Sequence, residues 1–208
     1  MLKLYGKKRA QRLIDRSAAY IGEAERRFHV PAACVRAVLY QEMTGIDLLD
    51  PVADLAVRFY WLRRRLRRGP LPARSGALGK KDSSTGWGQI FAYVAIRALN
   101  FAEDRGLGGY AALGLPAGQR LREDRDEDLR RVWFLLHRDR RANILLTAMN
   151  LLAAADEMTG RCDFASFSPD ELRLVFTRYN ANVRRVTRYG EEVYAHYLRC
   201  RAGEPVGV

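Results

Sequence analysis

The feature that most limits the fold is the spacing of apolar residues, which recurs every three or four positions along almost the whole chain. The clearest case is the segment 141–158, whose apolar stripe comprises Ile144, Leu145, Ala148, Leu151, Leu152 and Ala155. This spacing is typical of one face of an α-helix, and no convincing segment longer than a few residues alternates as a half-buried strand does. The sequence therefore predicts a mainly α fold with this helix at its centre.

Capping and turn residues divide the rest of the chain. A first helix is expected over 8–28, and Pro31 suits the first turn of a second. Asp50 and Pro51 predict the start of a third, and Ser168 begins a capping box. The third helix has an apolar stripe formed by Val52, Leu55, Phe59, Leu62 and Leu66. Helices are also expected over 90–103 and 129–137 and around 189–198, whereas 69–86 is predicted as a loop and 104–128 as irregular surface structure.

Length and charge bound the class of protein. A chain of 208 residues is long enough to bury a substantial core, and we expect one domain over 1–208. The formal net charge of +12 favours a polyanionic partner such as nucleic acid, anionic lipid or an acidic cell-wall polymer. Cys34, Cys162 and Cys200 form no CxxC pair, so we expect reduced thiols, no metal and no cofactor.

The amino terminus bears on localisation. Its first 16 residues, "MLKLYGKKRAQRLIDR", are basic but are followed by no apolar stretch of a signal peptide, and no run has the length of a membrane span. We expect a protein that is cytoplasmic when made, and that acts in the periplasm or cell wall if it is delivered or released there.

One acid stands at the end of an apolar helix. In "VPAACVRAVLYQEM", Glu42 follows Val38 by four positions and Val35 by seven, so on a helix it shares their inward face. Gly45 then predicts the helix end, which places Glu42 in the last turn. Burial and the negative pole of the helix both raise the pKa of a carboxyl group there. Such a group can hold a proton near neutral pH and donate it to a glycosidic oxygen. The alternative is a structural Glu42 that pairs with an arginine or reaches solvent.

Three segments together resemble one family. "VPAACVRAVLYQEM", "SSTGWGQI" and "RYNANVRRVTRYGEEVYAHY" occur in the order of the motifs of lytic transglycosylases and goose-type lysozymes, over about 18–197. Departures from the family pattern are Met43, Trp87, Gly88, Arg178 and Asn182. The chain is therefore similar to a divergent member of the lysozyme-like superfamily.

The resemblance implies a lysozyme-like helical domain with a substrate cleft, and a peptidoglycan-cleaving enzyme with Glu42 as general acid and base. It implies substrate-binding roles for Ser84, Gly86, Trp87, Gln89, Tyr179 and Asn180. The residue types suit these roles, because glycines let backbone approach a ligand, an amide pairs with sugar groups, and an indole offers a flat apolar face. A tight turn with a core tryptophan, and a helix end with a buried tyrosine, are the structural alternatives.

A second carboxylate would separate hydrolysis from transglycosylation. An inverting hydrolase needs a second acid beside its water, whereas a transglycosylase, as this family is understood, closes an internal ring on the sugar. Asp82, four residues before Gly86, is the first candidate, with a solvated loop residue as its alternative. Asp47, Asp50 and Asp54 are weaker candidates. Asp47 is better explained as a solvated loop residue, Asp50 as a helix cap and Asp54 as a charge suited to the helix dipole.

Two other functions stay open. A glycan-binding module without catalysis is compatible with the altered loop at Trp87 and Gly88. A nucleic-acid-binding protein is compatible with the net charge and with "RFYWLRRRLRR" over 58–68. In that segment Arg63, Arg64, Arg67 and Arg68 can equally form the wet face of a helix whose apolar stripe is packed. The three histidines lack metal-ligand spacing, and we assign them no catalytic role.

Overall fold

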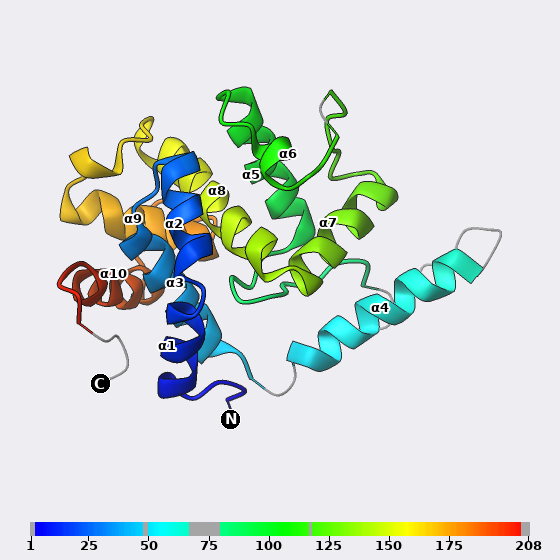
Figure 1. The fold of residues 1–208 in the computed structure, drawn as a ribbon, viewed down its shortest axis with the longest axis horizontal. Helices are drawn as coiled ribbons and strands as arrows, with labels where there is room; N and C mark the ends of the chain where they lie inside the picture. Colours follow the sequence, from blue (N-terminus) through cyan, green and yellow to red (C-terminus); the bar gives the residue numbers. More distant parts are fainter. Residues whose placement is uncertain (1–2, 48–49, 67–79, 117, 205–208) are drawn as a thin grey trace.

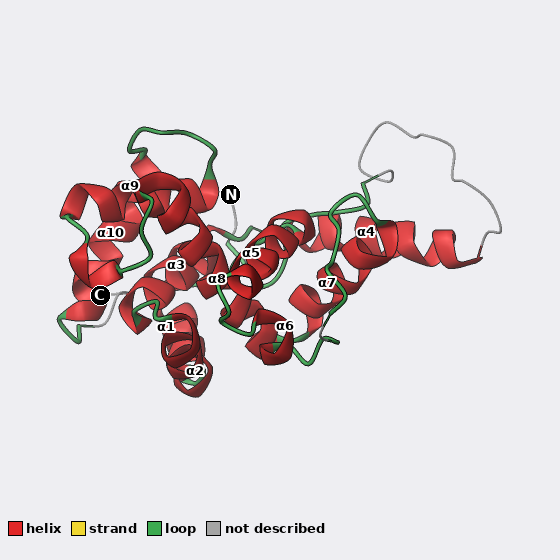
Figure 2. Cartoon of the chain, turned by 90° about the horizontal axis from the view of Figure 1, so that it is seen from above, coloured by secondary structure: helices red, strands yellow, loops and turns green. Residues whose placement is uncertain are grey.

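The chain folds into packed helices (Figures 1 and 2). The computed structural model describes residues 3–47, 50–66, 80–116 and 118–204. Its helices are α1 (Lys7–Asp15), α2 (Ala18–Phe28), α3 (Ala32–Gly45), α4 (Asp50–Leu66), α5 (Ala92–Asp104), α6 (Gly109–Ala112), α7 (Asp126–Arg138), α8 (Arg140–Thr159), η2 (Phe164–Ser166), α9 (Pro169–Asn180) and α10 (Arg188–Arg201). Within these described ranges, extended pairing is limited to two isolated bridges. The predicted mainly α fold is confirmed.

Helix α8 is the central element, as its apolar pattern predicts. It packs against α2, α3, α5, α7 and α9, and almost every side chain from Ala142 to Ala155 is buried. The Asp139 carboxylate accepts the Ala142 N–H at its start, and Gly160 closes it at φ +68°. Helix α10 packs across α3 and α9. The ends of α3, α9 and α10 therefore meet beside α8.

The single opening helix predicted over 8–28 is wrong. The structure divides it into α1 and α2 at Arg16 and Ser17. Ser17 is buried, its hydroxyl donates to the Leu13 carbonyl at 3.0 Å, and its N–H donates to the Ile14 carbonyl at 2.9 Å. A serine that bonds the preceding turn competes with helix propagation, and no glycine or proline marks the break.

Helix α4 forms where predicted, but the packing inferred for its apolar stripe is wrong. Val57 and Trp61 are buried on one face, whereas Val52, Leu55, Phe59, Leu62 and Leu66 are all exposed. Figure 1 shows α4 projecting from the other helices at one end of the molecule. The alternative in which the arginines form the solvent-facing side of a helix with a packed apolar stripe is therefore wrong, because the stripe is exposed to solvent as well. Arg67 and Arg68 lie outside the described residues.

The connections also differ from expectation. The segment 104–128, predicted as irregular, contains the short α6, and the Tyr110 hydroxyl there accepts the Leu121 N–H at 2.7 Å. Helix α7 begins at Asp126, three residues before its predicted start. Most of the loop predicted over 69–86 lies outside the described residues, and its described end leads into the site.

Candidate active site

Helix α3 carries Glu42 into the interior. Its buried side chains include Val35, Val38 and Leu39, and Glu42 continues their face in the last turn, as the spacing predicts. The helix ends at Gly45, and the extended backbone of Ile46 (φ −57°, ψ 127°) leads the chain away. Gly45 thus ends the helix without the left-handed turn that a glycine there often makes.

A cavity of about 600 Å³ opens in front of Glu42. Its walls come from the end of α3, the start of α4, the loop before α5 with the first turns of that helix, one face of α8, and the end of α9 with Tyr189 of α10. The lining residues that sequence reasoning did not assign to a site include Asp50, Phe91, Tyr93, Arg97, Asn150, Glu157 and Tyr189. The volume lies within the usual range for small-molecule sites.

The carboxyl group of Glu42 is held by one direct partner. The Tyr189 hydroxyl donates a hydrogen bond to Glu42 Oε1. Burial raises the pKa of Glu42 to about 7, the hydrogen bond from Tyr189 opposes that rise, and the negative charge of Asp50 adds to it. The expected direction is confirmed, and burial, one of the two causes that we expected, is the largest. Glu42 therefore exchanges its proton near neutral pH.

The "SSTGWGQI" segment is a tight loop fixed to α8. Thr85 and Ile90 pair through both backbone groups, at 3.2 and 3.3 Å. Gly86 has φ +73°, and a Cβ there would lie 2.1 Å from Asn143 Nδ2. A Cβ on Gly88 would lie 2.3 Å from Thr147 Oγ1. The glycines let the loop approach a helix of the protein itself, whereas sequence reasoning expected them to admit a ligand.

Polar residues of α8 hold this loop in place. The Asn143 side chain accepts the Gly88 N–H at 2.9 Å and donates to the Thr85 carbonyl at 3.3 Å. Asn143, Thr147 and Asn150 follow one another at intervals of four and three residues in an otherwise apolar helix, and all three are buried. Sequence reasoning missed them, although a polar stripe on a core helix is a signal that it must contact something polar.

Five of the residues predicted for the site line the cavity together: Glu42, Ser84, Gln89, Tyr179 and Asn180. Gln89 adopts the left-handed region at φ +46°, and its amide donates to the Gly86 carbonyl at 2.8 Å and accepts from the Ser84 hydroxyl at 3.2 Å. Much of its hydrogen-bonding capacity therefore shapes the loop.

The two predicted residues of α9 close the cavity from the other side. The Tyr179 hydroxyl donates to the Gly88 carbonyl at 2.7 Å, which ties α9 to the loop. Burial and the nearby Glu42 charge hold the pKa of Tyr179 well above its usual value. Asn180 is the exposed last residue of the helix. Asn182, which stands where the family pattern has glycine, does not adopt a left-handed backbone; among the described non-glycine residues only His29 and Gln89 do.

Trp87 and Gly86 lie outside the cavity lining. The Arg140 guanidinium lies 4.3 Å from the centre of the Trp87 ring, a cation–π contact. Trp87 is half-buried against the core, and neither residue is among those of the described chain that line the cavity. The structure thus supports the alternative of a tight turn with a packed tryptophan.

Asp82 has a structural task. Its two carboxylate oxygens accept the N–H groups of Ala92 and Tyr93, at 3.0 and 3.1 Å, and so cap the start of α5. Burial raises its pKa, and these backbone bonds oppose the rise. Asp82 is absent from the lining found for the described residues, whereas Asp50 is present there and accepts the Asp47 N–H at 2.8 Å. Asp50 is therefore a better candidate than Asp82 for a second carboxylate at this cavity.

The side chains and helices of the described residues bear on two kinds of partner, metal ions and membranes. In the part of the chain that the structure describes, no group of three or more histidine, cysteine or acidic side chains could hold a metal ion. No helix among the same residues is long and apolar enough to cross a membrane. Comparisons of the chain with protein families, with curated proteins and with solved structures found no match.

Proposed function

We propose that this protein cleaves the β-1,4 bond between N-acetylmuramic acid and N-acetylglucosamine in peptidoglycan, with Glu42 as general acid and base. One observation carries the proposal: a carboxyl group with a pKa of about 7 lies at the wall of a cavity large enough for sugar rings. A general acid is most effective when its pKa lies near the working pH.

The lining of the cavity suits a glycan. Phe91 and Tyr93 are exposed, and their ring centres lie 5.6 Å apart at its edge, where they offer apolar faces to a pyranose ring. Asn150 and Asn180 bring amide groups that can donate to and accept from sugar hydroxyls and acetamido groups. An apolar wall with a few polar groups is the common design of small-molecule sites.

The proposed reaction starts with one proton transfer. Tyr189 donates to Oε1 of Glu42, so the proton of the neutral carboxyl group resides on Oε2. Oε2–H protonates the glycosidic oxygen as the bond from that oxygen to the muramoyl C1 breaks, and the electron pair leaves with the N-acetylglucosamine oxygen. Tyr189 stabilises the carboxylate that forms.

The second step has two outcomes. If the C6 hydroxyl of the muramoyl unit attacks C1, its proton returns to Glu42 and the product carries a 1,6-anhydro ring. If a water attacks, a second carboxylate is needed to take its proton, and Asp50 is the candidate. We favour the internal attack, which needs no second acid, and mass spectrometry of the products separates anhydro ends from reducing ends.

The resemblance of the three segments to the lysozyme-like superfamily supports the same reaction. Glu42, Gln89 and Tyr179 each come from a different segment, and all three side chains line one cavity. Residues 47 positions or more apart would not be expected to meet in this way if each segment served only its local structure.

The experiment is release of soluble fragments from purified peptidoglycan sacs. We expect wild type to release them and Glu42→Gln to be at least 100-fold slower, since a positioned acid contributes about 10²–10⁴ to rate. Asp82→Asn is the matched control, because its carboxylate caps α5 outside the cavity. Equal release by wild type and Glu42→Gln contradicts the proposal, and sac binding without release assigns the cavity to a non-catalytic module.

A further inference from the structure

The exposed apolar stripe of α4 is the largest feature that the proposed reaction leaves unused. Relative exposures along it are 58% for Val52, 48% for Leu55, 50% for Phe59, 51% for Leu62 and 75% for Leu66. These residues follow one another at intervals of three and four, so they form one continuous line along the helix. A contiguous apolar surface of this kind marks an interaction site.

The opposite face of α4 fixes the helix in this orientation. The Asp54 carboxylate accepts from the Ser83 and Thr85 hydroxyls, at 2.9 and 2.8 Å, and lies 3.2 Å from His137 Nδ1. Trp61 is buried beside it. Rotating the helix to bury the stripe would break this polar cluster and expose the indole. The contacts of the inner face therefore keep the stripe exposed.

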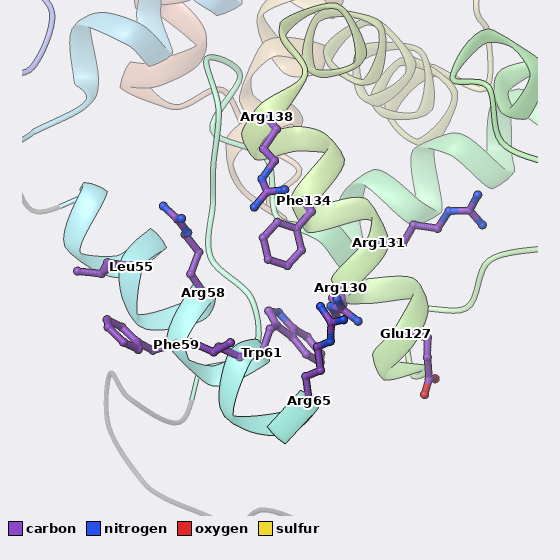
Figure 3. A pocket seen from close by; sticks show the side chains of 11 residues that line it. Leu55, Arg58, Phe59, Trp61, Arg65, Glu127, Arg130, Arg131, Phe134 and Arg138 are labelled. Carbon is purple, nitrogen blue, oxygen red and sulfur yellow. The ribbon is translucent and has the colours of Figure 1, made fainter. Parts of the chain in front are cut away.

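Arginines border the stripe and continue beyond it. Arg58 and Arg65 of α4 face Arg130 and Arg138 of α7 across a groove of about 740 Å³ (Figure 3). Arg131 also lines the groove, and Glu127 is the acid in its lining. The guanidinium of Arg138 lies 4.7 Å from the ring centre of Phe134 on the groove floor. The surface therefore combines aliphatic, aromatic and cationic groups.

Like charges argue against a second copy of the chain as the occupant. The stripe has the three-and-four spacing of a coiled-coil seam, and the positions that flank such a seam here include Arg58, Arg63 and Arg65. In a pair of α4 helices these flanking positions face one another, in either orientation, and would bring arginine against arginine. The occupant must be anionic as well as apolar.

We infer that α4 and the arginine groove dock this protein on a membrane surface that carries anionic phospholipids. An amphipathic helix with aliphatic and aromatic residues on one face and arginines beside them lies in the plane of the interface, with its apolar face among the acyl chains. The arginines of α7 extend the positive surface to a second helix, which suits the broad layer of lipid headgroups better than a single nucleic-acid strand. Nucleic acid would match the charge but would leave the aliphatic line uncovered.

The inference does not depend on glycan cleavage. Helix α4 begins at Asp50, which lines the Glu42 cavity, so docking through α4 would hold the cavity close to the membrane surface. A protein that docks but does not cleave, or cleaves but does not dock, separates the two proposals.

The test is co-sedimentation of the full chain with vesicles of phosphatidylcholine alone or with 30% phosphatidylglycerol. We expect binding to the anionic vesicles that weakens with added salt, and at least tenfold weaker binding to neutral ones. Leu55→Gln/Phe59→Gln/Leu62→Gln removes the apolar line and should weaken binding at least tenfold. Arg58→Gln/Arg65→Gln should weaken it roughly 25-fold, about fivefold per arginine near the surface.

Matched variants separate this surface from net charge and from misfolding. Arg16→Gln/Arg26→Gln removes the same charge from exposed positions just after α1 and on α2, away from α4 (Figure 2), and should change binding less than threefold. All substituted residues are exposed, so thermal midpoints should match wild type. Glu42→Gln should bind vesicles as wild type does.

Four results would overturn the inference. The first is equal binding to neutral and anionic vesicles, and the second is full binding by the apolar triple variant. The third is a wild-type dimer that the triple variant does not form, which would assign the stripe to a second copy of the chain. The fourth is retention on duplex DNA without vesicle binding, which would assign the arginines to nucleic acid.

Discussion

Helices α3 and α4 have similar sequence patterns and opposite surroundings. Both carry an apolar stripe with residues three or four apart, and both have acids near the cavity. The stripe of α3 is fully buried, and Glu42 continues it at the wall of the cavity. The stripe of α4 is exposed, while its buried face holds Asp54 and Trp61. Periodicity therefore predicts a helix and its apolar face, but the rest of the fold decides whether that face is covered.

The largest difference between the two helices is expected when the same atoms are removed from both stripes. Leu39→Ala on α3 should lower the free energy of unfolding by about 2–5 kcal/mol, because Leu39 is fully buried and a cavity remains. Leu62→Ala on α4 should change it by less than about 0.5 kcal/mol. Urea unfolding of the two variants measures the difference, and similar losses would show that α4 is packed in solution.

The inner face of α4 provides the next test. Asp54→Ala leaves two hydroxyl groups and His137 without their shared acceptor, and should lower the free energy of unfolding by about 1–3 kcal/mol. The control is Asp124→Ala, which removes an exposed carboxylate paired with Arg122 and should have little effect. If both variants unfold alike in urea, Asp54 does not anchor the helix.

The raised pKa of Glu42 should make the stability difference between wild type and Glu42→Gln depend on pH. Its folded pKa of about 7 lies above the ordinary value of 4.5, so the folded state favours the neutral acid and loses stability as pH rises between those values. Glu42→Gln lacks this titration. The variant should match wild type at pH 4 and be more stable by about 1–3 kcal/mol at pH 8. A difference that is flat across this range, measured by urea unfolding at each pH, contradicts the raised pKa.

The smallest expected effect concerns the partner of Glu42. Tyr189→Phe removes a hydrogen bond that lowers the pKa of Glu42, so the alkaline limit of glycan cleavage should move to higher pH by less than about one unit. Tyr194→Phe, on the same helix but outside the cavity lining, is the control. If the alkaline limit of the pH–rate profile moves to lower pH, or moves equally in both variants, the hydrogen bond from Tyr189 does not lower the pKa of Glu42.

Much of the helical framework could be predicted from sequence, because stripes, caps and prolines are local signals. The start of α9 at Ser168 with Glu171 and the central place of α8 are examples. The division of α1 from α2 could not, since it depends on a buried serine that bonds the preceding turn. The exposure of the α4 stripe could not be predicted either, because it depends on long-range contacts.

The candidate site was predicted in part for a similar reason. Glu42 and Tyr179 were predicted from the order of three segments along the chain, because each segment alone leaves a structural alternative open. Asp82 was misjudged because a carboxylate in a loop gives no sign that it caps a helix ten residues later. The pairing of Tyr189 with Glu42 spans 147 positions and follows from the packing of α10 on α3. Asn143 and Thr147 did leave a signal, a polar stripe within an apolar helix.

The most direct measurement of the central claim is the titration of the Glu42 carboxyl carbon by ¹³C NMR in protein labelled at glutamate, assigned by comparison with Glu42→Gln. We expect a midpoint near pH 7, at which the group is half protonated and able to donate to a glycosidic oxygen. A midpoint near 4.5 would mean that Glu42 is ionised at neutral pH, and would contradict its role as the acid.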